Sequence, residues 1–388
     1  MKKIGAFLLS LILISGMYIC IFAKNGTNYE ADLVSADFNV DAKSAILIEA
    51  STGTVLFEQN ADYAASPASV TKVMTLLLAM EALAEEKIQL NDTVMISENA
   101  ASMGGSQVFL EEGETMSVEE LLKCTVIASA NDAALALAEH ICGSEKAFVT
   151  QMNVRAKELG LKNTVFENVT GLDDTTEYHR SSARDIAIMS CELIKYPIIT
   201  EFASLWQDSI RNGEFTLTNT NRLVRYYDGC NGLKTGSTAK AGYCISAAAK
   251  RADMQLIAVI MGAESRDERN SIARTLLDFG FANYALYSQE EKAIEKVPVK
   301  GGDVSEVDIY QKPFFCTVPK SDLKKVEVLY EIPEYIQAPA EAGKTVGKIV
   351  YKIGDQKIGE TELYLKENLE NMNFVDIFIA LLGKIFSF

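Results

Sequence analysis

Histidine is nearly absent from this chain, and its cysteines are scattered. Two histidines occur among 388 residues, and the six cysteines beyond the N-terminal region are widely spaced, with no C-x-x-C pair. A zinc site or a disulfide framework needs such ligands at short, regular spacing. The sequence therefore indicates neither, and we expect buried single thiols whose pairing it leaves open. The six are Cys124, Cys142, Cys191, Cys230, Cys244 and Cys316.

Clusters of basic residues are also missing. The formal net charge is -16, from 53 acidic and 37 basic side chains. Such a surface repels nucleic acid and acidic lipid, which argues against either as a partner. A small basic pocket remains compatible with this charge.

The chain begins with an uncharged run. Lys2 and Lys3 precede a stretch without charge from Ile4 to Ala23, in the order typical of an export signal. We predict a signal peptide at residues 1–23 and an exported protein. Cleavage after Ala23 is one outcome, and retention as a membrane span is the other, because the run is long enough to cross a bilayer.

The middle of the chain predicts one mixed domain. Residues 44–57 have the pattern of a β-hairpin, and a helical half begins at Pro67. Strand signals return in GLKTGST, GYCISAAAKR and MQLIAVIMGA, before a helix from Arg266 to Tyr284. Strands, helices, strands and a helix in this order predict an α+β fold with an antiparallel sheet flanked by helices. We expect this domain to span residues 38–288.

Several helix boundaries are predicted within the helical half. Ser117 and Glu120 form a capping-box pattern, and Asn131 is placed to cap the next helix. Further helices are expected at residues 151–159 and 182–194.

The chain changes character near residue 295. Alternating runs such as KVEVLYEI, KIVYKI and ETELYL, separated by Gly, Pro and Lys, predict a small β-rich domain at residues 295–366. Residues 369–388 predict an amphipathic helix that is too short to span a membrane.

The stretch PASVTKVMTLLLAMEALA predicts a helix that is almost wholly apolar apart from Lys72 and Glu81. If Ser66 caps it and Pro67 is its first residue, Ser69 lies in the first turn, where free N–H groups and the helix dipole stabilise a developing negative oxygen. Lys72 shares the face of Ser69. Apolar neighbours should lower the pKa of its amine, so that it can accept the proton of Ser69. The pair can act as nucleophile and base in acyl transfer.

Taken alone, S-x-x-K also fits a surface lysine beside an ordinary helix-start serine. Two further motifs favour the catalytic interpretation. Ser129 and Asn131 lie on a short loop between apolar helices and can face a cleft, although Asn131 can also be a simple cap. Lys234 and Thr235 can receive a substrate carboxylate on a strand, where Gly236 lets another backbone approach closely. An ordinary strand edge bearing a lysine is the alternative.

In the order S-x-x-K, S-x-N, K-T-G, the three motifs match the set of penicillin-binding proteins and class A β-lactamases. The sequence resembles the low-molecular-mass penicillin-binding proteins, the serine-type D-alanyl-D-alanine carboxypeptidases. The resemblance extends to AILIEASTGTVLFEQNAD, DGCNGLKTGSTAKAGYC and the β-rich tail, and covers most of residues 38–388. It implies a β-lactamase/transpeptidase-like first domain.

The resemblance also implies residue roles in catalysis. Ser69 would be the acylated nucleophile, Lys72 its base and Ser129 a proton shuttle. Backbone N–H groups of Ser69 and Ser237 would form the oxyanion hole.

The implied substrate-binding residues follow the same motifs. Asn131 would bind the peptide and Lys72, while Lys234 and Thr235 would bind the terminal carboxylate of D-Ala. The implied binding set is Asn131, Lys234, Thr235, Gly236 and Ser237. No cofactor and no metal are implied.

One segment departs from the family pattern. Many relatives have Asn-Pro-His-Gly-Leu where this chain has residues 168–172, NVTGL, so the loop shape and substrate fit there are open. Neither His140 nor His179 is needed for the chemistry, and we expect core or surface roles for both.

The resemblance implies an exported D-alanyl-D-alanine carboxypeptidase at the outer face of the cytoplasmic membrane or in the cell wall. Its partners would be peptidoglycan stem peptides ending in D-Ala-D-Ala, with β-lactams as covalent inhibitors. The C-terminal helix resembles the family's amphipathic anchor to the membrane surface. A helix docked on the β-rich domain is the alternative.

The sequence has features that bear on two other functions. A serine β-lactamase needs a carboxylate to activate water, and Glu158 does not have the expected spacing. A β-lactam-acylated sensor or wall-associated scaffold with little turnover would also keep the nucleophile, but a sensor would need several membrane segments, and none is visible in the sequence.

Overall fold

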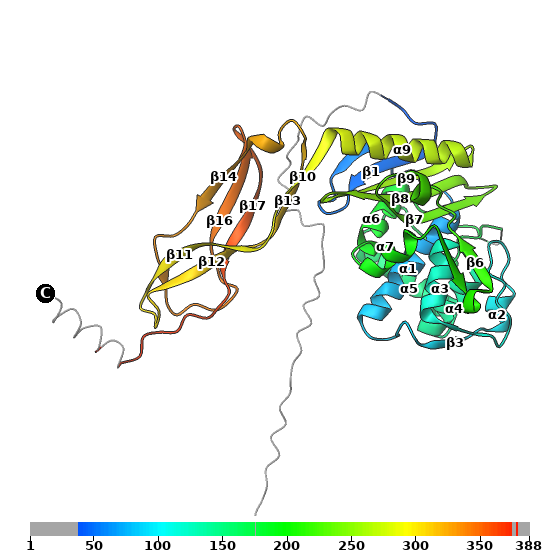
Figure 1. Cartoon of the computed structure of the whole chain (residues 1–388), viewed down its shortest axis with the longest axis horizontal. Helices are drawn as coiled ribbons and strands as arrows, with labels where there is room; N and C mark the ends of the chain where they lie inside the picture. Colours follow the sequence, from blue (N-terminus) through cyan, green and yellow to red (C-terminus); the bar gives the residue numbers. More distant parts are fainter. Residues whose placement is uncertain (1–37, 175, 375–377, 379–388) are drawn as a thin grey trace, which may run out of the picture.

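The computed structural model describes residues 38–174, 176–374 and 378. The predicted signal peptide at residues 1–23 lies outside them, as does most of the predicted C-terminal helix at residues 369–388. In the ranges that are described, no helix combines the length and apolarity needed to cross a membrane. A mixed helix and sheet body is followed by a smaller β-rich body (Figure 1).

Five strands of the described chain form the central antiparallel sheet, in the order β2-β1-β9-β8-β7. The predicted hairpin and the three predicted later strands are confirmed. Alternate residues of β9 face two different apolar cores, because successive side chains of a strand point to opposite faces. The strands are β1 (Ser44–Glu49), β2 (Val55–Gln59), β7 (Cys230–Thr238), β8 (Gly242–Arg251) and β9 (Met254–Ala263).

Helices cover both faces of this sheet. Helix α9 packs on one face, and α6 packs on the other with α1 behind it (Figure 1). The predicted antiparallel sheet flanked by helices is therefore confirmed. The helices are α1 (Lys72–Ala84), α2 (Glu98–Ala101), α3 (Val118–Ile127), α4 (Asn131–Cys142), α5 (Glu145–Glu158), α6 (Ala183–Leu193), α7 (Pro197–Ala203), α8 (Leu223–Tyr226) and α9 (Arg266–Asn283). Two short antiparallel pairs join β3 (Thr93–Met95) to β4 (Thr115–Ser117) and β5 (Gln207–Ile210) to β6 (Phe215–Thr218).

Helix starts were predicted with mixed success. The capping box of Ser117 and Glu120 at α3 is confirmed. The predicted cap by Asn131 is wrong, because Asn131 is the first residue of α4 and its side chain bonds elsewhere. The predicted cap by Ser66 with Pro67 as first helical residue is also wrong. A 3₁₀ turn, η1 (Ala68–Thr71), precedes α1 there, and Pro67 stands before that turn.

The β-rich tail is confirmed. A ribbon of β10 and β13 leads from α9 into it, and the predicted boundary at residue 288 falls within β10 (Figure 1). Among the described residues, six strands form its sheet in the order β14-β16-β17-β12-β11-β15. These elements are β10 (Tyr284–Gln289), β11 (Lys292–Lys300), β12 (Glu306–Gln311), β13 (Phe314–Pro319), β14 (Val326–Glu331), β15 (Ile336–Gln337), β16 (Thr345–Ile353) and β17 (Gln356–Leu365), with the 3₁₀ turn η3 (Leu323–Lys325). The 3₁₀ turn η2 (Arg211–Gly213) lies in the first body, between β5 and β6.

The six described cysteines are free thiols. Four are buried, as predicted, while Cys142 and Cys316 are partly exposed. In the part of the chain that is described, no three His, Cys, Asp or Glu side chains are grouped so as to hold a metal ion.

Candidate active site

Ser69 lies in the tight turn η1, directly before α1. Ala68, which precedes it, has a φ of 48°, a left-handed conformation that costs energy for a residue with a Cβ. Gly236 on β7 abuts the same turn, since an added Cβ would lie 2.8 Å from the Ser69 nitrogen. The predicted close backbone approach at Gly236 is thus confirmed. The nucleophile candidate sits on a backbone held against the K-T-G strand.

Lys72 is fully buried and contacts Ser69. Its Nζ lies 3.0 Å from Ser69 Oγ and 2.6 Å from Asn131 Oδ1, and it also donates to the Thr170 carbonyl at 3.1 Å. Burial lowers the pKa of Lys72 to about 7, although the charge of Asp132 partly opposes this shift. The predicted direction of the shift is confirmed. A substantial fraction of the amine is therefore neutral near pH 7 and can accept a proton.

Ser129 contacts the K-T-G strand through Lys234. It is buried and has a φ of 62°, a second left-handed residue at the site. Lys234 Nζ donates to Ser129 Oγ at 2.8 Å and to the Thr235 carbonyl at 2.8 Å. Burial lowers the pKa of Lys234 well below its ordinary value, and the nearby Lys72 and Arg269 lower it further. An anion that enters here would reverse this shift and restore the charge on Lys234.

The K-T-G end of the site contains residues that the motifs did not predict. Thr235 Oγ1 donates to Thr220 Oγ1 at 2.8 Å. The Arg269 guanidinium from α9 is buried and contacts the Cys244 carbonyl at 3.4 Å. Burial lowers its pKa to about 10. The positive charge of Arg269 acts on Lys234, whose pKa it lowers, and the sequence does not predict this because it depends on the packing of α9 on β8.

The S-x-N loop is held by a rim loop at residues 104–110. Asn131 donates from its backbone to the Ser106 carbonyl at 2.7 Å and from its side chain to the Gly104 carbonyl at 2.7 Å. An added Cβ on Gly105 would come within 2.7 Å of the Asn131 amide. Asn131 therefore joins Lys72 on one side to the rim loop on the other.

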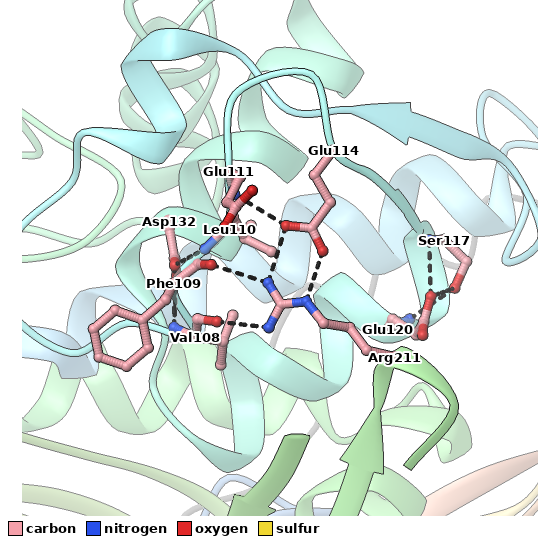
Figure 2. A network of polar contacts seen from close by, with 9 residues as sticks. All are labelled: Val108, Phe109, Leu110, Glu111, Glu114, Ser117, Glu120, Asp132 and Arg211. Carbon is pink, nitrogen blue, oxygen red and sulfur yellow. Dashed lines mark hydrogen bonds and ion pairs between the residues drawn. The ribbon is translucent and has the colours of Figure 1, made fainter. Parts of the chain in front are cut away.

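Figure 2 shows how this rim loop is fixed further along. The buried Asp132 carboxylate accepts from the backbone N–H groups of Val108 and Leu110. Arg211 donates to the carbonyls of Val108 and Phe109 and forms a two-pronged ion pair with Glu114. Phe109, with a φ of 56°, is 68% exposed. The backbone is thus held by an anion and a cation, and an aromatic side chain is left at the surface.

The segment that departs from the family pattern reaches the site through its backbone. Asn168 Oδ1 accepts from the Thr170 and Gly171 N–H groups at 3.2 Å and 2.7 Å, which closes a tight turn. This turn aims the Thr170 carbonyl at Lys72. NVTGL therefore contributes one acceptor to the buried amine.

His179 is part of the core beneath this segment. Its Nδ1 accepts from the Glu167 N–H at 3.1 Å, so its Nε2 carries the proton and donates to Thr71 Oγ1 at 2.8 Å. Burial lowers its pKa to about 4. The predicted core role is confirmed for His179, and His140 lies at a partly exposed position.

Comparison with known proteins agrees with this geometry. A sequence profile of the peptidase S11 family, described as D-alanyl-D-alanine carboxypeptidase, matches residues 30–265. The chain belongs to this family. A second profile, described as penicillin-binding protein 5, C-terminal domain, matches residues 281–371. The family that the three motifs indicated is confirmed, and so is the fold class predicted from the order of strands and helices, apart from the C-terminal helix.

Individual relatives match between about two thirds and nearly all of this chain. The D-alanyl-D-alanine carboxypeptidase DacF of Bacillus subtilis (strain 168) is 42% identical over 383 residues, which is 97% of this chain and 98% of DacF. The crystal structure of penicillin binding protein 5 from Haemophilus influenzae superposes with a TM-score of 0.75 and 32% identity, over 87% of this chain and 100% of that one. The structure of penicillin-binding protein D2 from Listeria monocytogenes in its ampicillin-bound form superposes with a TM-score of 0.59 and 29% identity. The match covers 64% of this chain and 100% of that one.

Proposed function

We propose that this S11 protein removes the terminal D-alanine from peptidoglycan stem peptides through an acyl-Ser69 intermediate. Its similarity to named D-alanyl-D-alanine carboxypeptidases favours this activity over a β-lactamase or a sensor. The observation that carries the mechanism is the buried Lys72 amine, 3.0 Å from Ser69 Oγ with a pKa of about 7. A buried amine that is partly neutral is what general-base activation of a serine requires.

Acylation begins with the Ser69 hydroxyl. Its proton passes to Lys72 Nζ as Ser69 Oγ attacks the carbonyl carbon between the two D-alanines. The carbonyl oxygen becomes negative and accepts hydrogen bonds from the backbone N–H groups of Ser69 and Ser237. The close approach of Gly236 to the Ser69 nitrogen supports this pairing, because it brings the two backbones together.

Loss of D-alanine then needs a proton on its amine. Lys72 holds the proton taken from Ser69, and the Ser129 hydroxyl can relay it to the leaving nitrogen. The C–N bond breaks, and free D-alanine departs. Water next attacks the ester carbonyl, which releases the shortened peptide and regenerates the Ser69 hydroxyl.

The K-T-G end is assigned to the terminal carboxylate. Lys234 and Thr235 would bind its oxygens, and the buried Arg269 adds positive charge nearby. The excess of cations in this part of an acidic protein supports an anionic ligand. The same groups would bind the carboxylate of a β-lactam, whose ring carbonyl would acylate Ser69. The ampicillin-bound relative supports this second reaction.

The proposed location outside the cytoplasmic membrane rests on the sequence at both ends. Residues 1–23 have the pattern of an export signal, and residues 369–388 that of an interfacial anchor. Liposome binding by the full chain, compared with a chain ending at Glu367, tests the anchor. Equal binding by both would contradict it.

The activity is tested by measuring free D-alanine released from diacetyl-L-Lys-D-Ala-D-Ala. The full chain is compared with Ser69→Ala, and labelled penicillin reports acylation separately. We expect release and labelling in the wild type and neither in the variant. Labelling of Ser69 without release of D-alanine would instead favour the sensor or scaffold. Release that persists in Ser69→Ala would contradict the mechanism.

A further inference from the structure

Asp173 hydrogen-bonds to two segments that lie far apart in the sequence. One of its oxygens, Oδ2, accepts from Ser66 Oγ at 2.8 Å and from Thr238 Oγ1 at 2.5 Å. Ser66 lies just before the nucleophile turn and is 7% exposed. Thr238 ends β7, just after the K-T-G motif. A single carboxylate oxygen therefore joins the two segments that bound the candidate site.

Both partners lie close to the proposed oxyanion-hole donors. Ser66 is three residues before Ser69, and Thr238 directly follows Ser237. The distance between the Ser69 and Ser237 N–H groups depends on how these two segments are held together. Oxyanion-hole donors act only when they lie about 2.7–3.1 Å from the reacting oxygen, so a small displacement of either weakens them.

The segment that carries Asp173 also packs on the nucleophile turn. Gly171, two residues earlier, has a φ of 81°, and an added Cβ there would lie 1.8 Å from the Ala68 carbonyl oxygen. Asp173 is therefore attached to a stretch of backbone that is itself fixed against the turn. A shift of its carboxylate would be passed to Ser66 and Thr238 together.

We propose that Asp173 is a positioning residue that sets the separation of the Ser69 and Ser237 N–H groups, and so the strength of the oxyanion hole. The inference rests on the proposed acyl-Ser69 mechanism. A carboxylate suits this task, because it only accepts hydrogen bonds and its charge strengthens both of them.

The choice of variants follows from the two bonds sharing one oxygen. Asp173→Ala removes both acceptors. Asp173→Asn keeps one oxygen, which can accept from both hydroxyls, although without the charge. Asp174→Asn is the matched control, since Asp174 is adjacent and exposed.

The rate constant for acylation of Ser69 by labelled penicillin is measured for each full-length protein. It is normalised to the fraction of molecules that become labelled at the end of the reaction. Loss of one oxyanion donor lowers kcat by about 10²–10³ in a serine protease. We expect Asp173→Ala to acylate about 10- to 100-fold more slowly, Asp173→Asn to lose less than about fivefold, and Asp174→Asn to match the wild type. KM for the D-Ala-D-Ala peptide should stay within about twofold, because the donors act mainly on the transition state. Asp173→Ala leaves Lys72 unchanged. The pH at which the acylation rate falls in acid should therefore be the same as in the wild type.

A double-mutant cycle tests the shared oxygen. Ser66→Ala should slow acylation in the wild type but add less than about twofold to Asp173→Ala. Equal effects of Ser66→Ala in both backgrounds would overturn the inference, as would an Asp173→Ala protein that acylates at the wild-type rate.

Failure of the proposed function would be seen separately. If the wild type is labelled but releases no D-alanine, the carboxypeptidase activity fails while the acylation rates still decide the role of Asp173. If the wild type is not labelled at all, hydrogen exchange of the backbone amides in residues 69–70 and 237–238 decides it. Faster exchange in Asp173→Ala than in Asp174→Asn supports the positioning role, and equal exchange overturns it.

Discussion

Gly171 and Gly236 contact the same short stretch of backbone, residues 67–70. A Cβ on Gly171 would lie 1.8 Å from the Ala68 oxygen, and a Cβ on Gly236 would lie 2.8 Å from the Ser69 nitrogen. Contacts this short with backbone atoms cannot be relieved by moving a side chain. The turn that carries Ser69 therefore keeps its shape only because two neighbouring segments have no side chain at these positions.

Gly171→Ala should abolish labelling of Ser69 by penicillin. The new methyl group would collide with the Ala68 carbonyl, and the turn or the 168–172 loop would have to move. Gly160→Ala is the matched control, since Gly160 also has a positive φ, of 71°, but has no atom within 4 Å of an added Cβ. The control should lose only about 1–2 kcal/mol of stability and keep its labelling. Equal labelling of the two variants would contradict the packing argument.

Acylation of Ser69 should slow as the pH falls through about 7. The pKa of Lys72 is about 7 in the folded protein, so the amine is protonated below that pH and cannot accept the Ser69 proton. The rate constant for penicillin acylation, measured from pH 5 to 9, checks this. Lys72→Ala should lower the rate by about 10²–10⁴ and remove the acid limb. An acid limb that persists in Lys72→Ala belongs to another group and would refute the assignment.

The free carboxylate of the substrate should bind with uptake of a proton. Lys234 has a strongly lowered pKa in the free site, and a bound anion favours its charged form. KM for the D-Ala-D-Ala peptide should therefore rise with pH, whereas KM for the same peptide with a C-terminal amide should not. Parallel pH dependence of the two KM values would show that Lys234 does not recognise the carboxylate.

His179 should lower the stability of the protein in acid. Its folded pKa is about 4, below the unfolded value near 6.5, so the unfolded state binds one more proton between these limits. The contribution of the neutral His179 to the free energy of unfolding is fully present above about pH 6.5. It is lost as the pH falls toward about 4, by on the order of 3 kcal/mol in total. The chain has two histidines, so their ring signals can be followed by NMR. A His179 signal that titrates near pH 6.5 in the folded protein would contradict this.

Much of the fold could be predicted, because its determinants are local. The apolar run MQLIAVIMGA predicts a strand, and it forms β9. Helix α3 starts where its capping box predicts. The start of α1 was mispredicted since the Ser66 hydroxyl bonds to Asp173, 107 residues away, rather than to the helix. Asn131 was mispredicted for a similar reason, because its amide binds Lys72 and the rim loop. Tertiary contacts override local capping preference at both positions.

The motifs located the candidate nucleophile and its amine, but could not locate the residues that hold them. Ser69 and Lys72 are three residues apart, and residues with this separation share one face of a helix. The sequence alone therefore places Lys72 beside Ser69. Arg269, Thr170 and Asp173 come from other segments and have no spacing rule relative to the motifs. Only the packing of α9 and of residues 168–173 brings them to the site.

The Arg211 clamp on the rim loop should affect acylation as well as stability. Arg211→Ala would leave the Val108 and Phe109 carbonyls and Glu114 without their shared partner (Figure 2). The rim loop also holds Asn131, which contacts Lys72, so a looser rim should slow acylation about 3- to 10-fold, the effect of about 1 kcal/mol. Arg211→Lys should not restore the acylation rate, because an ammonium cannot reproduce the fork of a guanidinium.

Arg155→Ala is the control, since Arg155 pairs with Glu81 within the helices away from the rim loop. Thermal unfolding should show both alanine variants to be destabilised, while penicillin acylation slows only for Arg211→Ala. If the two variants acylate equally fast, the rim loop does not position Asn131.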